Sequence, residues 1–87
     1  MHNNAEAVFV WASHNAIQLK TDLMPILLQK QELLADPCNA GLELDIEKQY
    51  VDAMRSELAH RIGNALNLNA EAVLMYVEDI NLDELMK

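Results

Sequence analysis

The residues that could do catalytic or metal-binding chemistry are few and lie far apart in the sequence. His2, His14 and His60 fall in three separate segments, without the i,i+4 spacing that lets one helix present two histidines to a zinc ion. The single cysteine, Cys38, would need a histidine and an orienting group beside it to act as a nucleophile. Ser13 and His14 are only adjacent in sequence, which is not a catalytic dyad. We therefore expect no catalytic residue, no metal site and no bound cofactor.

The composition and charge exclude further classes of function. The chain has 87 residues, of which 52% are hydrophobic, and a formal net charge of −8. Residues 1–31 are electrically balanced, so the whole excess of negative charge lies in residues 32–87. Nucleic-acid binding needs clustered Lys and Arg, and no basic run is present, so direct binding is not expected. The acidic half predicts either a solvated surface, which we favour, or contact with a basic protein partner.

The same pattern bears on the compartment. One cysteine cannot form an internal disulfide, and the longest apolar runs, 8–12 and 24–28, are far short of the roughly 20 residues of a membrane span. No positively charged start precedes an apolar run. We therefore expect a cytoplasmic protein without a membrane segment.

The clearest structural signal is the segment 42–68. Its apolar residues recur at spacings of three and four, which indicates one stripe along a helix that must be buried against the chain or against a second copy. Glu57 and Arg61 on the other face form a favourable i,i+4 pair. The stripe consists of Val51, Met54, Leu58, Ile62 and Leu66.

An N-terminal arm precedes this central helix. Asn4 is a candidate N-cap, and the run 8–12 fits either a buried strand or a helix. Pro25 cannot donate a backbone hydrogen bond, so we expect a bend near Thr21 and a second helix over 23–35 with Asp22 as its N-cap. The turn over 36–41 should fold the arm back antiparallel on the central helix.

Asn69 is expected to cap a final segment, 70–79, followed by a tail that either forms a last helical turn or remains an exposed docking peptide. The predicted fold is all-α: a single domain over 1–87, a small bundle of three or four helices with a bent N-terminal arm packed antiparallel on a long central helix. The alternative is an α+β fold with strands near 8–12 and 73–77.

Two segments resemble parts of known families. The sequence from Leu34 to Pro37, followed by a long helix, resembles the helical hairpin of type III secretion needle subunits, but the chain continues further after Leu68 than that pattern does. The segments 67–69 and 73–77 resemble the helix-then-strand unit of tautomerases and of the cell-division topological factor. The chain lacks the N-terminal catalytic proline of the first and the basic membrane-targeting start of the second. Each resemblance covers under half of the chain, and we adopt neither.

These observations predict a non-enzymatic, acidic protein-binding module, such as an adaptor, a secretion-type chaperone or an inhibitor, acting through apolar helix faces as a homodimer. The alternatives are a self-assembling helical subunit and a small α+β enzyme. Gly63 interrupts the central helix beside other small residues, which indicates either a close helix contact or a tolerated glycine near a helix end. The predicted interface combines this strip with neighbouring apolar residues: Met54, Ser56, Leu58, Ala59, Ile62, Gly63, Val73, Tyr76 and Val77.

Overall fold

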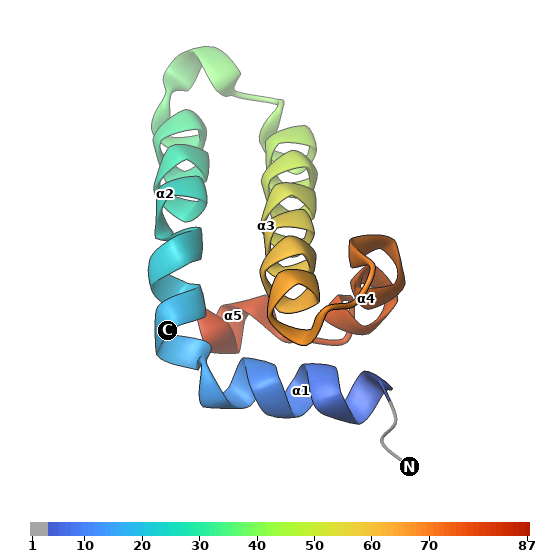
Figure 1. The fold of residues 1–87 in the computed structure, drawn as a ribbon. Helices are drawn as coiled ribbons and strands as arrows, with labels where there is room; N and C mark the ends of the chain where they lie inside the picture. Colours follow the sequence, from blue (N-terminus) through green and yellow to red (C-terminus); the bar gives the residue numbers. More distant parts are fainter. Residues whose placement is uncertain (1–3) are drawn as a thin grey trace.

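The computed structural model describes residues 4–87, and these residues contain five α-helices, one short 3-10 helix and no strand. The all-α prediction is therefore confirmed (Figure 1). The runs 8–12 and 73–77, for which strands were the alternative, are both helical. The elements are α1 (Asn4–His14), α2 (Ala16–Ala35), η1 (Pro37–Asn39), α3 (Glu43–Leu66), α4 (Ala70–Val77) and α5 (Leu82–Leu85).

An antiparallel hairpin of α2 and α3 forms the long dimension of the molecule (Figure 1). At its open end α1 runs across the two helices, α4 packs against α3, and α5 lies against α2. The result is an elongated molecule with extents of 52 × 22 × 18 Å. Among the described residues, no helix is long and apolar enough to cross a membrane.

The hydrophobic core sits at the end of the hairpin where α1, α4 and α5 gather. Each of these three helices contributes to it, as do the adjoining halves of α2 and α3. The most deeply buried side chains come from four helices, so no pair of helices could form this core alone. They are Leu19, Leu23, Leu58, Ile62, Val8, Val73 and Val77.

The N-terminal arm has a break at Asn15, between α1 and α2, that the sequence analysis does not predict. The backbone N–H of Asn15 donates to the carbonyl of Trp11 at 3.0 Å, and its side-chain Nδ2 donates to the same oxygen at 2.8 Å. Asparagine side chains compete in this way with the next helical hydrogen bond. The chain therefore turns between α1 and α2 while both backbone groups of Asn15 stay paired, since its carbonyl accepts the N–H of Leu19 at 2.9 Å.

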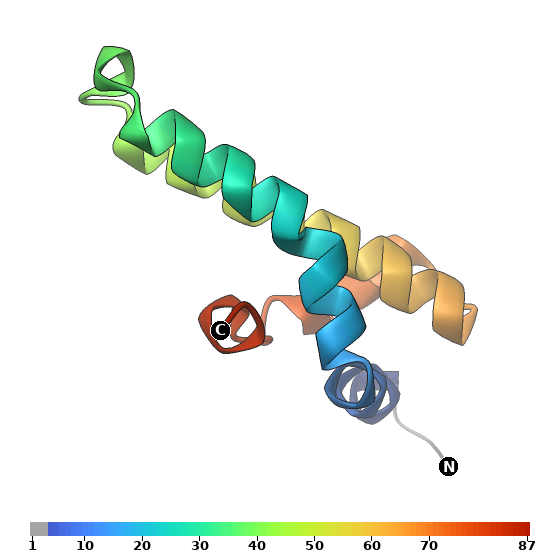
Figure 2. The ribbon, with the colours of Figure 1, turned by 90° about the vertical axis from the view of Figure 1, so that its left-hand side faces the viewer.

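Pro25 lies inside α2 and does not start a new helix, so the predicted N-cap at Asp22 is wrong. Figure 2 shows that the axis of α2 changes direction near its light-blue section, which is the bend expected from the carbonyl that Pro25 cannot satisfy. An internal proline costs about 3 kcal/mol. Burial of Leu19 and Leu23, worth roughly 1.5–3 kcal/mol each, offsets that cost and keeps both halves of α2 in one helix.

The predicted turn over 36–41 and the predicted N-cap at Asn69 are present. Asp36 is extended, with ψ of 120°, and its carboxylate accepts a hydrogen bond from the N–H of Cys38 at 2.9 Å. Gly41 has a φ of +91°, a conformation that glycine adopts without strain. Asn69 caps α4, where its Oδ1 accepts from the N–H of Glu71 at 2.8 Å. The tail forms α5, a single turn whose Leu82 is buried, so it is not an exposed peptide.

Candidate functional site

The predicted interface residues are mostly in the core of the chain itself. Side chains that are buried within the folded chain offer little surface to a second copy in this conformation. Two members of the predicted interface are less buried: Ser56 is exposed and Tyr76 is half-buried. The seven buried members are Met54, Leu58, Ala59, Ile62, Gly63, Val73 and Val77.

Gly63 lies at a close contact, as one interpretation of the sequence required. A Cβ atom at this position would lie 2.8 Å from the backbone oxygen of Leu68, which is closer than real Cβ contacts. The carbonyl of Gly63 in turn accepts the N–H of Leu68 at 2.8 Å. The partner is therefore the connection from α3 to α4, and not the N-terminal arm or a second copy.

A cleft of about 410 Å³ lies between α3 and the segment that joins α4 to α5. On α3 it is lined by Glu47, Val51 and Arg55, which recur at helical spacing and so share one face of the helix. The opposite wall is the run 78–83. Asn81 holds that wall in place because its Oδ1 accepts the N–H of Glu84 at 3.2 Å, which caps α5.

The lining of this cleft, which we call the acidic cleft, combines carboxylates with an apolar floor. Four acidic side chains face one guanidinium, so the local potential is negative. Val51 and Ile80 are half-buried and Leu82 is buried. Of the four carboxylates only Glu47 has an ion-pair partner among residues 4–87, Lys30 at 2.9 Å. The other three are Glu78, Asp79 and Asp83.

Arg55 is the unusual member of the acidic cleft. Its Nε is buried and has no hydrogen-bond partner in the part of the chain that the structure describes. A buried donor left unpaired costs roughly 1–3 kcal/mol. The sequence shows the acidic residues of 78–83, but nothing in it indicates that Arg55 faces them.

A smaller hollow of about 220 Å³ lies between α3 and α4. It is lined in part by His60 and Glu71, with Leu74 beside them. Ser56, the exposed member of the predicted interface, also lines it. This hollow contains no arrangement of a nucleophile, a base and an orienting group of the kind that acyl transfer requires.

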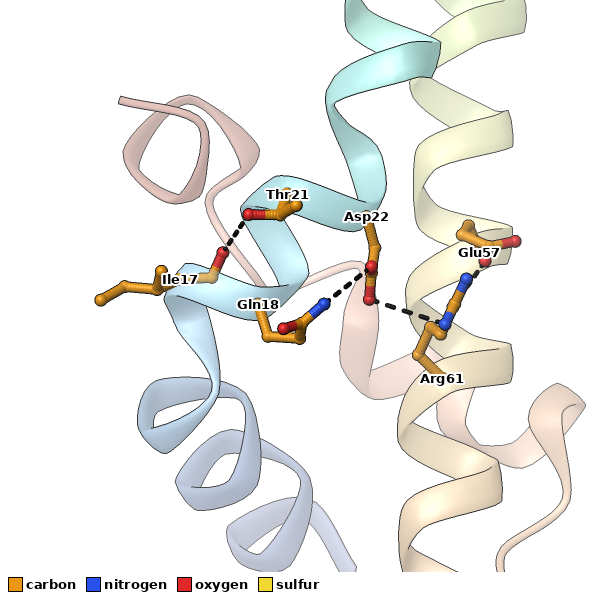
Figure 3. Close-up of polar contacts among 6 residues, drawn as sticks. All are labelled: Ile17, Gln18, Thr21, Asp22, Glu57 and Arg61. Atoms are coloured by element: carbon orange, nitrogen blue, oxygen red, sulfur yellow. Dashed lines mark hydrogen bonds and ion pairs between the residues drawn. The ribbon is translucent and has the colours of Figure 1, made fainter.

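The charged network between α2 and α3 is structural. Arg61 donates through Nε to Glu57 at 2.7 Å and lies 3.6 Å from Asp22 (Figure 3). The hydrogen bond that Arg61 donates to Glu57, followed by the charge of Asp22, raises the pKa of Arg61 above its usual value. The side chain is exposed, so we assign this network a role in aligning the two helices and little stability.

The remaining reactive side chains are dispersed. His14 is exposed at the end of α1, and Cys38 is an exposed free thiol in η1, at the far end of the hairpin. His2 lies outside the described residues. Within residues 4–87 no group of three His, Cys, Asp or Glu side chains is arranged to hold a metal ion.

Comparisons of this chain with protein-family models, with curated proteins and with solved structures find no match.

Proposed function

We propose that this chain is a small protein-binding module that acts as a homodimer and holds a basic segment of a partner protein in the acidic cleft. The single observation that carries the proposal is the lining of the cleft: three carboxylates without ion-pair partners in residues 4–87 surround an apolar floor. A lysine or arginine of the partner would meet Glu78, Asp79 and Asp83, while its apolar neighbour would cover Ile80.

The guanidinium of Arg55, which lines the same cleft, supports a peptide as the ligand. A free cation could neutralise the carboxylates, but it would offer no acceptor to this guanidinium. A peptide segment supplies both groups, because its backbone carbonyl would accept from the guanidinium of Arg55 while its basic side chain meets the acid. Leu44, 87% exposed on α3, extends the apolar surface beyond the cleft, since it shares a helix face with Val51.

The test uses a defined probe. An amphipathic helical peptide of lysine and leucine should bind at 50 mM salt and weaken steeply at 500 mM, because screening shortens the reach of the charges. A peptide of the same length with glutamate in place of lysine is the matched control and should not bind. Replacing Asp79 and Asp83 by asparagine should weaken binding of the lysine peptide by on the order of 10-fold.

The outcome that contradicts the proposal is equal binding of the lysine peptide to the wild type and to the Asp79→Asn, Asp83→Asn variant, measured by fluorescence anisotropy. The peptide would then be held by the general negative charge of the protein. The second candidate, a self-assembling helical subunit, predicts a mass that grows with concentration in light scattering, whereas the module should stop at a closed dimer.

A further inference from the structure

A second stripe, apolar at four of its six positions, runs along α2 on the side turned away from α3. Its positions are spaced four, three, four, three and four residues apart, which is the heptad spacing of a helix that packs against another helix. The stripe is distinct from Leu19 and Leu23, which face the core of the chain. It consists of Ile17, Thr21, Met24, Leu28, Gln31 and Ala35, and we call it the α2 stripe.

The α2 stripe is not covered by the described chain. Ile17 is 85% exposed and Leu28 is 55% exposed, while Met24 is half-buried. In Figure 3 the side chain of Ile17 points away from α3. Thr21 would leave no unpaired hydroxyl in an interface, because its hydroxyl donates to the carbonyl of Ile17 at 3.1 Å.

The surface area of the chain leaves room for an interface of ordinary size. A compact monomer of 9.8 kDa exposes about 5,200 Å², and this chain exposes 6009 Å². The radius of gyration is 14.1 Å, against about 12 Å for a compact domain of this length. The excess of several hundred Å² is of the same order as the roughly 800 Å² that each partner buries in a standard interface.

The charge distribution selects a second copy as the occupant of the α2 stripe. Two identical surfaces meet in a two-fold dimer, so any acidic patch would face itself and repel. Within α2 the two lysines, Lys20 and Lys30, balance Asp22 and Glu32, whereas the chain as a whole has a net charge of −8. The outer face of α2 is thus a surface where two copies can meet without large repulsion.

We propose that two copies of this chain pair through the α2 stripe, with their α2 helices antiparallel. The two-fold axis crosses the stripe between Met24 and Leu28, at the height of residue 26 along the helix. This proposal rests on the dimer of the proposed function and adds the surface that forms it. The spacing is symmetric about that axis: Met24 packs against Leu28 of the other copy. In the outer layers the large Ile17 meets the small Ala35, and Thr21 meets Gln31.

Charge also fixes the antiparallel direction. Residues 32–47, around the far end of the hairpin, hold five acidic and no basic side chains. A parallel pair would place these two ends side by side. An antiparallel pair separates them by about the length of α2, 20 residues or roughly 30 Å, which exceeds the Debye length of ~8 Å at physiological salt.

The first test measures mass by light scattering. The wild type should give twice the 9.8 kDa of one chain, and Leu28→Glu should dissociate with a Kd raised on the order of 100-fold. Met75→Glu is the matched control, since Met75 is 69% exposed on α4, and it should remain dimeric. A monomeric wild type, or a control that dissociates as readily as Leu28→Glu, overturns the proposal.

The second test reads the direction of pairing. In a Cys38→Ser background, Ile17→Cys and Ala35→Cys proteins of different tag length are mixed and oxidised. The antiparallel pair should give a disulfide between one copy of each variant and little disulfide between two copies of the same variant. Disulfides mainly between two copies of the same variant would indicate parallel helices and overturn the proposal, as would no disulfide at all. Peptide binding in the acidic cleft is measured in a separate experiment. If the peptide does not bind, the mass and disulfide results still test the dimer.

Discussion

The two ends of the α2–α3 hairpin are built from the same kinds of residue but are held together differently. At one end, which we call the base, α1, α4 and α5 surround the hairpin and a core forms. The other end, the stalk, is residues 28–50, and none of its side chains belongs to that core or packs on it. Its one buried hydrophobic residue is Ile46, 8% exposed.

This difference shows what a third layer contributes to a helical protein. Two helices cover each other along one seam only, so the stalk leaves Leu28, Leu42 and Leu44 between 48% and 87% exposed. In the base, helices on further sides bring Leu58 and Ile62 to 0% exposed. Regions with few buried apolar contacts open at lower free energy than the rest of a domain. We therefore expect the stalk to open at a lower free energy than the base.

The largest expected effect tests this comparison with one substitution at two places on α3. Leu58→Ala in the base should lower the free energy of unfolding by about 3–4 kcal/mol, because it removes a fully buried side chain and leaves a cavity. Leu44→Ala in the stalk should change it by less than about 0.5 kcal/mol. Urea unfolding followed through Trp11, which packs on the core, measures both. Equal losses of unfolding free energy for the two variants would show that Leu44 is buried in solution, and would contradict the difference between stalk and base.

A medium effect is expected at the junction of α3 and α4. Gly63→Ala should lower the free energy of unfolding by about 1–2 kcal/mol, since its Cβ would meet the backbone oxygen of Leu68 at 2.8 Å. The exposed neighbour Asn64 is the control: Asn64→Ala should stabilise slightly, because alanine is the better helix former. A higher melting temperature for Gly63→Ala would show that the connection from α3 to α4 can move to accommodate the added Cβ, and would contradict this prediction.

The smallest effect concerns the ion pair that links the two helices of the stalk. Lys30 and Glu47 lie 2.9 Å apart, with Glu47 half-exposed. A double-mutant cycle with Lys30→Ala and Glu47→Ala should give a coupling energy of about 0.2–1 kcal/mol that disappears in 1 M salt. A coupling well above this range would mean that charge, and not helix packing alone, holds the stalk closed.

Much of the fold could be predicted because its signals are local. The helical spacing over 42–68 corresponds to α3, Gly41 adopts the positive φ of the turn, and Asn69 caps α4 through its own side chain. Each of these features depends on residues within a few positions of one another. The polar run of Ser13, His14 and Asn15 also marks the break at Asn15 locally, but the sequence analysis used only the stronger helix breaker, Pro25, and so predicted a bend near Thr21 alone.

The candidate site could be predicted only in part. The acidic residues of 78–83 are visible in the sequence as one cluster, and so is the negative charge of the second half. The position of Arg55 among them depends on how the segment after α4 returns across α3, which no local pattern encodes. The predicted interface includes the strongest apolar stripe of the sequence. In a small chain such a stripe is also the surface that the chain's own core uses, and here Met54, Leu58 and Ile62 are buried in it.

The sequence by itself determined that this protein is helical, where its main turn lies and which faces of its helices are apolar, because periodicity and capping act over one or two helical turns. Tertiary structure alone decided what covers each face. Met54, Leu58 and Ile62 are covered by the chain itself, whereas Ile17 and Leu28 on α2 are not. Helical spacing shows that a stripe exists, and only the packing of segments distant in sequence settles whether that stripe is filled from within or left for a partner.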